Sequence, residues 1–333
     1  MKRILIAVVL LIALSGLAVV STIAYLSLES YRRFENETFV TVPRGTGTAE
    51  IGRTLAQAGV IRYPWEIWIE RLRQPSAKIQ AGEYRFDKSA TPGEVYARLA
   101  RGDIFYFEFT VPEGSNIFDI AASLEQQGIM PALDFQNAAS DPTSIHDLAP
   151  NAPSLEGFLF PSTYRITHST TAADLCKQMT DTFRRQWRRA GGANADVQQT
   201  VTLASLVEKE TGVAAERPLV AGVFVNRLRI GMRLECDPTT IYAALLDNRY
   251  SGAIHKSDLA SQNPYNTYQH AGLPPGPIAN PGFDSIQAAL HPTETNYLFF
   301  VAKPEGGGHN FSTDLQAHNA ATKAYRKKSN ARR

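Results

Sequence analysis

Two carboxylates stand in an otherwise small and apolar stretch of this chain, Ala204-Ser205-Leu206-Val207-Glu208-Lys209-Glu210-Thr211. Residues 197–211 contain no proline, and the first glycine, Gly212, is a natural helix stop, so we predict a helix that ends there. An ionised carboxylate is costly to bury, so a glutamate in such a helix either finds a partner or has its pKa raised. A carboxyl that stays protonated near neutral pH can donate a proton to a leaving oxygen. Glu208 and Glu210 are therefore the first candidates for catalysis.

The spacing of these glutamates limits what they can do together. Two residues along a helix turn through roughly 200°, so the side chains of Glu208 and Glu210 point away from each other. They cannot flank one bond as the paired carboxylates of an ordinary glycosidase do. If the helix is catalytic, one glutamate works alone, and the other is structural or pairs with an arginine such as Arg217 or Arg227. Periodicity does not say which one is catalytic, and a solvated side chain is the ordinary alternative for a helical glutamate.

Length and composition exclude several classes of function. A chain of 333 residues suggests two or three domains, and its formal net charge of +2 gives no argument for nucleic-acid binding. The basic run at residues 323–333 is typical of a solvated tail. The sequence has no phosphate loop, no dinucleotide-binding fingerprint and no clear metal-ligand spacing, so we expect no cofactor or metal. Cys176 and Cys236 form no CxxC motif; two buried thiols are the ordinary interpretation, and a disulfide in an oxidising compartment is the alternative.

The N-terminus has the pattern of a membrane anchor. Lys2 and Arg3 precede an uncharged apolar run, residues 4–28. This run is long enough to cross a bilayer core, which needs about 20 residues. A cleaved signal peptide has a shorter apolar region, about 7–15 residues, and a small-residue cleavage site, so a retained anchor is favoured. The positive-inside rule keeps Lys2 and Arg3 in the cytoplasm, although Arg32 and Arg33 weaken this orientation. In a bacterium, the rest of the chain would then lie outside the cytoplasmic membrane.

A short internal repeat occupies the N-terminal half. Val42-Pro43-Arg44-Gly45 and Val111-Pro112-Glu113-Gly114 are each followed, at identical spacings, by two apolar residues and a glycine. Each copy is predicted to form a strand, a Pro-x-Gly turn, a helix and a glycine helix stop. A strand-like segment, Ala81–Phe86, follows the first copy, and the similar segment Gly157–Pro161 follows the second. We therefore expect a pair of small βα modules; structural packing alone explains the pattern, and glycan binding is the alternative.

The region beyond the glutamates is dense in proline and glycine. The segments Pro264–Tyr268 and Gly272–Pro281 carry fixed turns together with Asn, Thr and Tyr side chains. Amide and hydroxyl groups bond sugar hydroxyls, and aromatic rings lie against sugar faces. This composition suits a carbohydrate ligand, and an ordinary surface loop over packed tyrosines fits it equally well.

Taken in order, these segments resemble the endolytic murein transglycosylase family, also called YceG-like. Besides the stretch quoted first, the resemblance rests on Leu155–Pro161, Val223–Leu228, Asp237-Pro238-Thr239, Tyr265–Tyr268, Gly272–Ile278 and Asn280-Pro281-Gly282. It covers nearly the whole chain, including the anchor, and Cys236 stands where a polar residue is expected. The resemblance implies cleavage inside peptidoglycan glycan strands near the membrane surface, which releases nascent strands made by membrane-bound synthases.

The resemblance also implies roles for individual residues. The family's catalytic residue is taken as the first Glu of Val-Glu-Lys-Glu-Thr, which corresponds to Glu208. Lytic transglycosylases use one carboxyl as acid and then base, which agrees with a lone glutamate of raised pKa. The family's N-terminal module resembles a LysM glycan-binding fold. Our candidates for holding the sugar chain are Asn226, Tyr265, Asn266, Thr267 and Tyr268.

We therefore expect an α+β protein with one transmembrane helix. The expected divisions are a cytoplasmic tip and anchor (1–30), paired βα modules that include a LysM-like subdomain (37–150), a mixed α/β catalytic domain (151–325) and a basic tail (326–333). The catalytic domain should lie on the outer side of the cytoplasmic (inner) membrane, held by a single-pass anchor. One alternative is a non-enzymatic, membrane-tethered wall-binding scaffold. The other is a hydrolase, which needs a second carboxylate near Glu208, such as Glu156 or Asp237.

Overall fold

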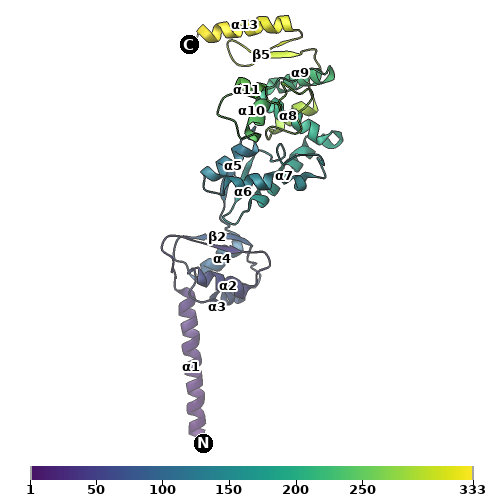
Figure 1. Cartoon of the computed structure of the whole chain (residues 1–333). Helices are drawn as coiled ribbons and strands as arrows, with labels where there is room; N and C mark the ends of the chain where they lie inside the picture. Colours follow the sequence, from purple (N-terminus) through teal and green to yellow (C-terminus); the bar gives the residue numbers. More distant parts are fainter. Residues whose placement is uncertain (1, 332–333) are drawn as a thin grey trace. The chain divides into compact units, whose positions relative to one another are not determined.

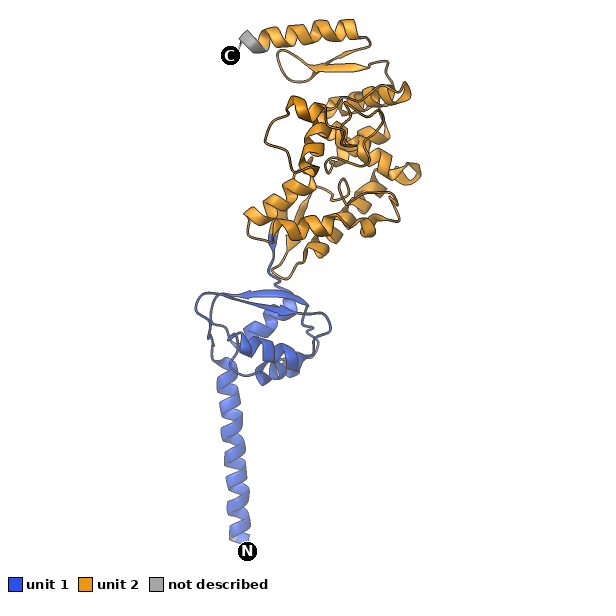
Figure 2. Ribbon diagram, in the orientation of Figure 1, with its two compact units in different colours: residues 1–107 blue, residues 108–333 orange. Residues whose placement is uncertain are grey.

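The computed structural model describes residues 2–331 of the chain. Two compact units are present, Met1–Phe107 and Glu108–Arg333, and Figure 2 colours them separately. The sequence-based division placed both βα copies together in residues 37–150, whereas the compact units divide at Phe107. The reason is pairing: the strand of the second copy hydrogen-bonds to a strand near residue 165, so this copy belongs to the larger unit.

A single long helix opens unit 1. Helix α1 (Lys2–Leu28) contains the apolar run Ile4–Leu28, which has a mean hydropathy of 2.9. Its length and composition are those of a membrane span. Figure 1 shows α1 as one uninterrupted helix at the N-terminal end of the chain. The last turn of α1 packs on α4 (Pro92–Arg101) and buries the Ser27 side chain there.

The rest of unit 1 is a small α+β fold. Strand β1 (Thr38–Val42) pairs antiparallel with β2 (Gly82–Phe86), so that Val40 faces Tyr84 across the pair. Helices α2 (Thr48–Gln57), α3 (Trp65–Arg73) and α4 pack together beside this pair. The core is made by the inward residues of these elements, among them Leu55, Ile67, Tyr84, Val95, Tyr96 and Leu99. The strand expected over Ala81–Phe86 is confirmed, and the likeness to LysM stays a prediction.

Both copies of the repeat have the predicted order of strand, turn, helix and glycine. In the second copy the elements are β3 (Phe107–Thr110) and α5 (Ile117–Gln126). The turn glycines Gly45 and Gly114 have φ angles of 84° and 75°, which L side chains rarely adopt. Gly157–Pro161, whose sequence is similar to that of Ala81–Phe86, does not form a strand: Gly157 and Phe158 lie in a turn. The strand that pairs with β3 is β4 (Thr163–Ile166).

Unit 2 is otherwise built mainly from helices. They are α6 (Ala132–Ala139), α7 (Ala172–Arg189), α8 (Val197–Glu210), α9 (Arg217–Arg229), α10 (Asp237–Leu246), α11 (Lys256–Leu259), α12 (Phe283–Leu290) and α13 (Leu315–Ala331). Helix α8 packs against α9, α10 and α12 around a buried apolar cluster that includes Leu206, Val220 and Phe224. Strands β5 (Phe299–Ala302) and β6 (His309–Ser312) form an antiparallel pair against which α13 packs. The predicted basic tail is helical up to Ala331, and residues 332–333 lie outside the described residues.

Candidate functional site

Helix α8 has a side-chain cap at its start and a defined end. The Asp196 side chain accepts a hydrogen bond from the backbone N–H of Gln199 at 2.9 Å and so caps the first turn. The helix ends at Glu210, because Thr211 is extended with φ of −140°; Gly212 follows but has no left-handed conformation. In the middle of α8, the Ser205 hydroxyl accepts from the Ile278 backbone N–H at 3.1 Å. The small side chain of Ser205 therefore lets the proline-rich segment Gly272–Pro281 approach α8 closely.

The Glu208 side chain is enclosed and fully paired. One oxygen, Oε1, accepts from Arg217 Nη2 at 3.2 Å, and the other, Oε2, accepts from the Gly282 backbone N–H at 3.0 Å. Only 7% of this side chain is exposed. A cation and a backbone donor both stabilise the ionised form of a carboxylate. Glu208 therefore takes part in an ion pair that joins α8 to α9, and its catalytic role stays a prediction.

Arg217 is the centre of a larger charge cluster. Besides Glu208, its guanidinium lies 3.8 Å from Glu113 and 3.5 Å from Asp284. Glu113 is the variable residue of the second Pro-x-Gly turn, so the repeat delivers a carboxylate to this cluster. Burial, followed by the nearby charge of Glu208, raises the pKa of Glu113. No pattern in the sequence predicts this cluster, because its members come from four separate segments.

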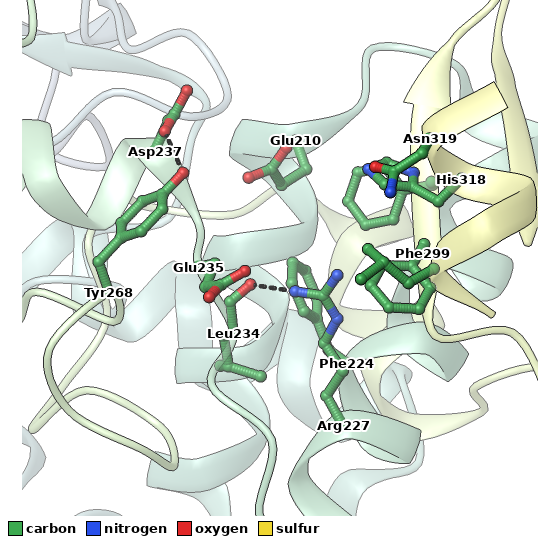
Figure 3. Close-up of a pocket in the computed structure, with 12 residues that line it drawn as sticks. Glu210, Phe224, Arg227, Leu234, Glu235, Asp237, Tyr268, Phe299, His318 and Asn319 are labelled. Carbon is green, nitrogen blue, oxygen red and sulfur yellow. Dashed lines mark hydrogen bonds between the residues drawn. The ribbon is translucent and has the colours of Figure 1, made fainter. Parts of the chain in front are cut away.

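Glu210 lies on the other side of α8, as the helical spacing predicts. Its carboxyl lines a pocket of about 380 Å³ that Figure 3 shows, and Glu208 is not among the described residues around that pocket. Burial raises the pKa of Glu210, a hydrogen bond with the Cys236 thiol acts against this, and the charge of Asp237 raises it further. A carboxyl with a raised pKa beside an open pocket is the arrangement that a general acid requires.

The remaining wall of this pocket is polar and aromatic. Tyr268 donates its hydroxyl hydrogen to Asp237 Oδ1 at 2.6 Å. Arg227 donates to the backbone oxygens of Leu234 at 2.7 Å and of Leu298 at 2.6 Å, and its guanidinium lies 5.3 Å from the Phe299 ring centre. The full wall comprises Glu210, Phe224, Arg227, Leu234, Glu235, Asp237, Tyr268, Phe299, Phe300, Leu315, His318 and Asn319.

Two arginines were candidate partners for Glu210. The structure pairs Arg217 with Glu208 instead. Arg227 bonds backbone oxygens, and its charge acts on Glu210 without a direct ion pair being formed. Both cysteines, Cys176 and Cys236, are buried and free, as the ordinary interpretation of the sequence expects.

Of the predicted sugar-binding residues, Tyr268 lies in this pocket and the others lie elsewhere. Tyr265 is buried in the apolar cluster, with its ring 5.1 Å from that of Tyr242. The Asn266 amide donates to three backbone oxygens, of which that of Ser261 is nearest at 2.8 Å. The Thr267 hydroxyl accepts from the Cys236 backbone N–H at 3.0 Å. Asn266 and Thr267 therefore shape the loop that presents Tyr268, and direct sugar contact by these residues stays a prediction.

Two further residues of the sequence-based hypotheses have structural contacts. Asn226 donates to the backbone oxygens of Thr295 at 2.7 Å and Tyr297 at 3.0 Å. Glu156 is buried and accepts from the Ile117 backbone N–H and from Asn280 Nδ2, both at 2.9 Å. Burial raises the pKa of Glu156 to about 8. Of the two candidate second carboxylates for a hydrolase, Asp237 lines the same pocket as Glu210, and Glu156 is not among the described residues around it.

Comparison with known proteins identifies the family. A family model described as the YceG-like family matches residues 40–324 of the chain. The chain belongs to this family. The YceG-like match spans both compact units except for α1 and the ends of the chain.

Relatives named "Endolytic murein transglycosylase" resemble this YceG-like chain over most of its length. The relative from Bacillus subtilis (strain 168) is 32% identical over 306 residues, which cover 86% of this chain and 84% of that protein. The relative from Streptococcus pneumoniae serotype 2 (strain D39 / NCTC 7466) is 30% identical over 311 residues and covers 84% of this chain, but only 56% of that longer protein. The crystal structure of a putative YceG-like protein from Listeria monocytogenes superposes with a TM-score of 0.56 at 27% identity, covering 86% of this chain and 99% of that one.

Proposed function

We propose that this protein is a membrane-anchored lytic transglycosylase that cleaves within peptidoglycan glycan strands. Cleavage would leave 1,6-anhydro-N-acetylmuramic acid ends and would terminate the elongation of nascent strands. The observation that carries the proposal is the place of Glu210: its carboxyl has a raised pKa and lines a polar pocket. The other glutamate of the helix, Glu208, pairs with Arg217. The names of the relatives from B. subtilis and S. pneumoniae support the same reaction.

In this proposal Glu210, rather than Glu208, is the catalytic acid. Protonated Glu210 donates its proton to the glycosidic oxygen between N-acetylmuramic acid and N-acetylglucosamine. The resulting carboxylate then takes the proton from the C6 hydroxyl of the same muramic sugar, whose oxygen attacks C1 and closes the anhydro ring. The attacking group is tethered to the reacting carbon, so the reaction has the advantage of a high effective concentration. One carboxyl therefore serves as acid and then as base.

The other pocket residues would hold the sugar chain. Tyr268 and Asp237 offer a hydroxyl and a carboxylate at one side of the pocket, and the ring of Phe299 lies at another. Sugar rings bind through hydrogen bonds to their hydroxyls and through contact of their faces with aromatic rings. Asn266 and Thr267 act as positioning residues, because they fix the loop that ends at Tyr268.

Helix α1 would place this activity at the membrane. Its apolar run of 25 residues exceeds the roughly 20 that span a bilayer core. Retention of this helix as a single-pass anchor, with the rest of the chain outside the cytoplasmic membrane, would hold the pocket near nascent strands and near the membrane-bound synthases that make them.

The decisive experiment compares two variants of neighbouring glutamates. Purified full-length protein is incubated with peptidoglycan, and the muropeptides are analysed by mass spectrometry for anhydro ends. Glu210→Gln is expected to lower the rate at least about 100-fold, which is the usual contribution of general acid–base catalysis. Glu208→Gln is the matched control and is expected to lose less than tenfold while folded. The reverse pattern would return the catalytic role to Glu208.

Product analysis also separates the rival functions. The hydrolase alternative is favoured by one observation, namely that Asp237 shares the pocket with Glu210. A hydrolase adds water and gives reducing ends in place of anhydro ends. A non-enzymatic scaffold binds glycan strands without releasing either product.

A further inference from the structure

Helix α3 exposes three large apolar side chains to solvent and buries two glutamates beside Ile67. Trp65, Trp68 and Leu72 follow the spacing i, i+3, i+7, which places them within about 60° of one another on the helix surface. This face is open: Trp68 is 53% exposed and Leu72 is 61% exposed. The opposite face is buried and carries Glu66 and Glu70. A helix in water normally shows the converse arrangement.

The buried glutamates show that this orientation is built into the fold. Glu66 accepts a hydrogen bond from the Arg62 backbone N–H at 3.1 Å, and Glu70 accepts one from Arg73 at 2.7 Å. Turning α3 over to hide its tryptophans would break the bond between Glu66 and Arg62, and it would also pull Ile67, which is 0% exposed, out of the core of unit 1. The exposed apolar face is therefore a stable feature of unit 1 and not an adjustable one.

Tyr63 extends the same face beyond the start of the helix. Its ring stacks on that of Trp65 at 5.6 Å between centroids, with 10° between the planes. We call Tyr63, Trp65, Trp68 and Leu72 the α3 outer face. Arg71 and Arg73 lie on the same helix and are both exposed. A surface of tryptophan and tyrosine next to arginine is the composition found at membrane–water interfaces.

The start of α3 is tied to the end of α1. Glu29, which follows the last residue of α1, forms an ion pair with Arg62 at 3.1 Å. The Arg62 guanidinium also lies 5.2 Å from the ring centre of Tyr31, and the Arg33 backbone N–H donates to the Gly59 oxygen at 2.9 Å. The chain leaving α1 thus packs directly against the segment that leads into the α3 outer face.

The length of α1 sets where that junction lies. The 25 apolar residues of α1 span roughly 38 Å at 1.5 Å per residue, against a hydrocarbon core of about 30 Å. When α1 spans a bilayer, its end and Glu29 therefore reach the headgroup region. Tyr63 and Trp65 follow Arg62 by one and three residues, so they lie close to this junction.

From this continuity we propose that the α3 outer face inserts into the lipid headgroup layer beside α1. Unit 1 then rests on the membrane surface through a second contact rather than swinging freely from its anchor. This inference depends on the proposed retention of α1 as a membrane span, but not on the reaction that unit 2 carries out.

The chain provides its own reporters, because it contains three tryptophans. Two of them, Trp65 and Trp68, belong to the α3 outer face, and Trp187 is buried in unit 2. Full-length protein is reconstituted into phosphatidylcholine vesicles with and without brominated acyl chains, and tryptophan emission is compared. We expect quenching by the brominated lipid in the wild type and in Trp187→Phe. We expect the double variant Trp65→Phe/Trp68→Phe to lose that quenching.

Co-flotation of the same samples with the vesicles separates this inference from the anchor itself. Protein that floats but shows no more quenching than the double variant overturns membrane contact by the α3 outer face and leaves the anchor intact. Protein that does not float overturns the anchor and the contact together. Activity on peptidoglycan is measured in parallel, so that a failure of the proposed reaction is recognised independently.

Discussion

Glu208 and Arg217 form an ion pair of 3.2 Å between Oε1 and Nη2, with both side chains at most one-tenth exposed. The pair joins the end of α8 to the start of α9, and the Gly282 backbone N–H completes it. Glu210, two residues further along α8, lines the pocket instead. The two glutamates of one short motif therefore have different surroundings: Glu208 pairs with an arginine, whereas Glu210 lines the pocket and bonds only the Cys236 thiol among the described side chains.

Removing Arg217 should reveal how much this pair contributes. Arg217→Met leaves the Glu208 carboxylate nearly buried without its cation, which costs about 3–5 kcal/mol when buried pairs are broken. Chemical denaturation should therefore give a large loss in the free energy of unfolding. Lys177→Met is the control, because its pair with Asp181 is exposed and such pairs contribute about 0.2–1 kcal/mol. Equal losses in the two variants would contradict a structural role for Arg217.

The close approach of Gly282 to Glu113 gives a second prediction. A Cβ atom at Gly282 would lie 2.1 Å from Glu113 Oε1, so Gly282→Ala must displace that carboxylate from the cluster around Arg217. Because Glu113 is 52% exposed and the clash is with the end of its flexible side chain, we expect a loss below about 1 kcal/mol, less than the cost of overpacking a core. In a Glu113→Ala background the same substitution should cost much less, since nothing is left to clash. A double-mutant cycle measures this coupling, and additive losses would show that the two residues do not meet.

Local features of the fold could be predicted from the sequence because they depend on nearby residues. Glycine at Gly45 and Gly114 allows the two turns of the repeat. The absence of proline before Thr211 allows α8 to form. The opposed directions of Glu208 and Glu210 follow from helical geometry alone. Their different partners could not be predicted, because Arg217 and Gly282 reach α8 from other segments.

The separation of the five candidate sugar-binding residues in the structure has a related physical reason. Asn and Thr side chains bond backbone groups as readily as they bond sugars, so composition alone cannot separate a binding loop from a loop that braces itself. In Asn266 the amide is used by three backbone oxygens. Tyr268 differs because its hydroxyl reaches Asp237 at the pocket wall.

This difference between Asn266 and Tyr268 can be measured. Asn266→Ala leaves buried backbone oxygens without donors, at about 1–3 kcal/mol for an unsatisfied buried group, and should lower the melting temperature. Tyr268→Phe removes an exposed hydroxyl and should leave the melting temperature nearly unchanged while it weakens glycan binding. Thermal unfolding and glycan co-sedimentation of both variants check this. A Tyr268→Phe protein that binds glycan normally would exclude a role for that hydroxyl.

Glu156 should make the stability of the protein depend on pH. Its pKa of about 8 in the folded state lies above the ordinary value of 4.5, so between these pH values the folded chain holds a proton that the unfolded chain releases. The stabilisation is complete below about pH 4.5 and is lost as the pH rises towards 8, by up to about 1.4 kcal/mol per pH unit. Glu156→Gln removes this titration and should flatten the profile measured by denaturation from pH 5 to 8. It should also lower stability overall, because the amide retains one acceptor oxygen, whereas Ile117 N–H, Asn280 Nδ2 and the Tyr242 hydroxyl all bond the carboxyl. Glu305→Gln, at an exposed site, should keep the wild-type slope. An unchanged slope in Glu156→Gln would mean that this carboxyl is ionised in the folded protein despite its burial.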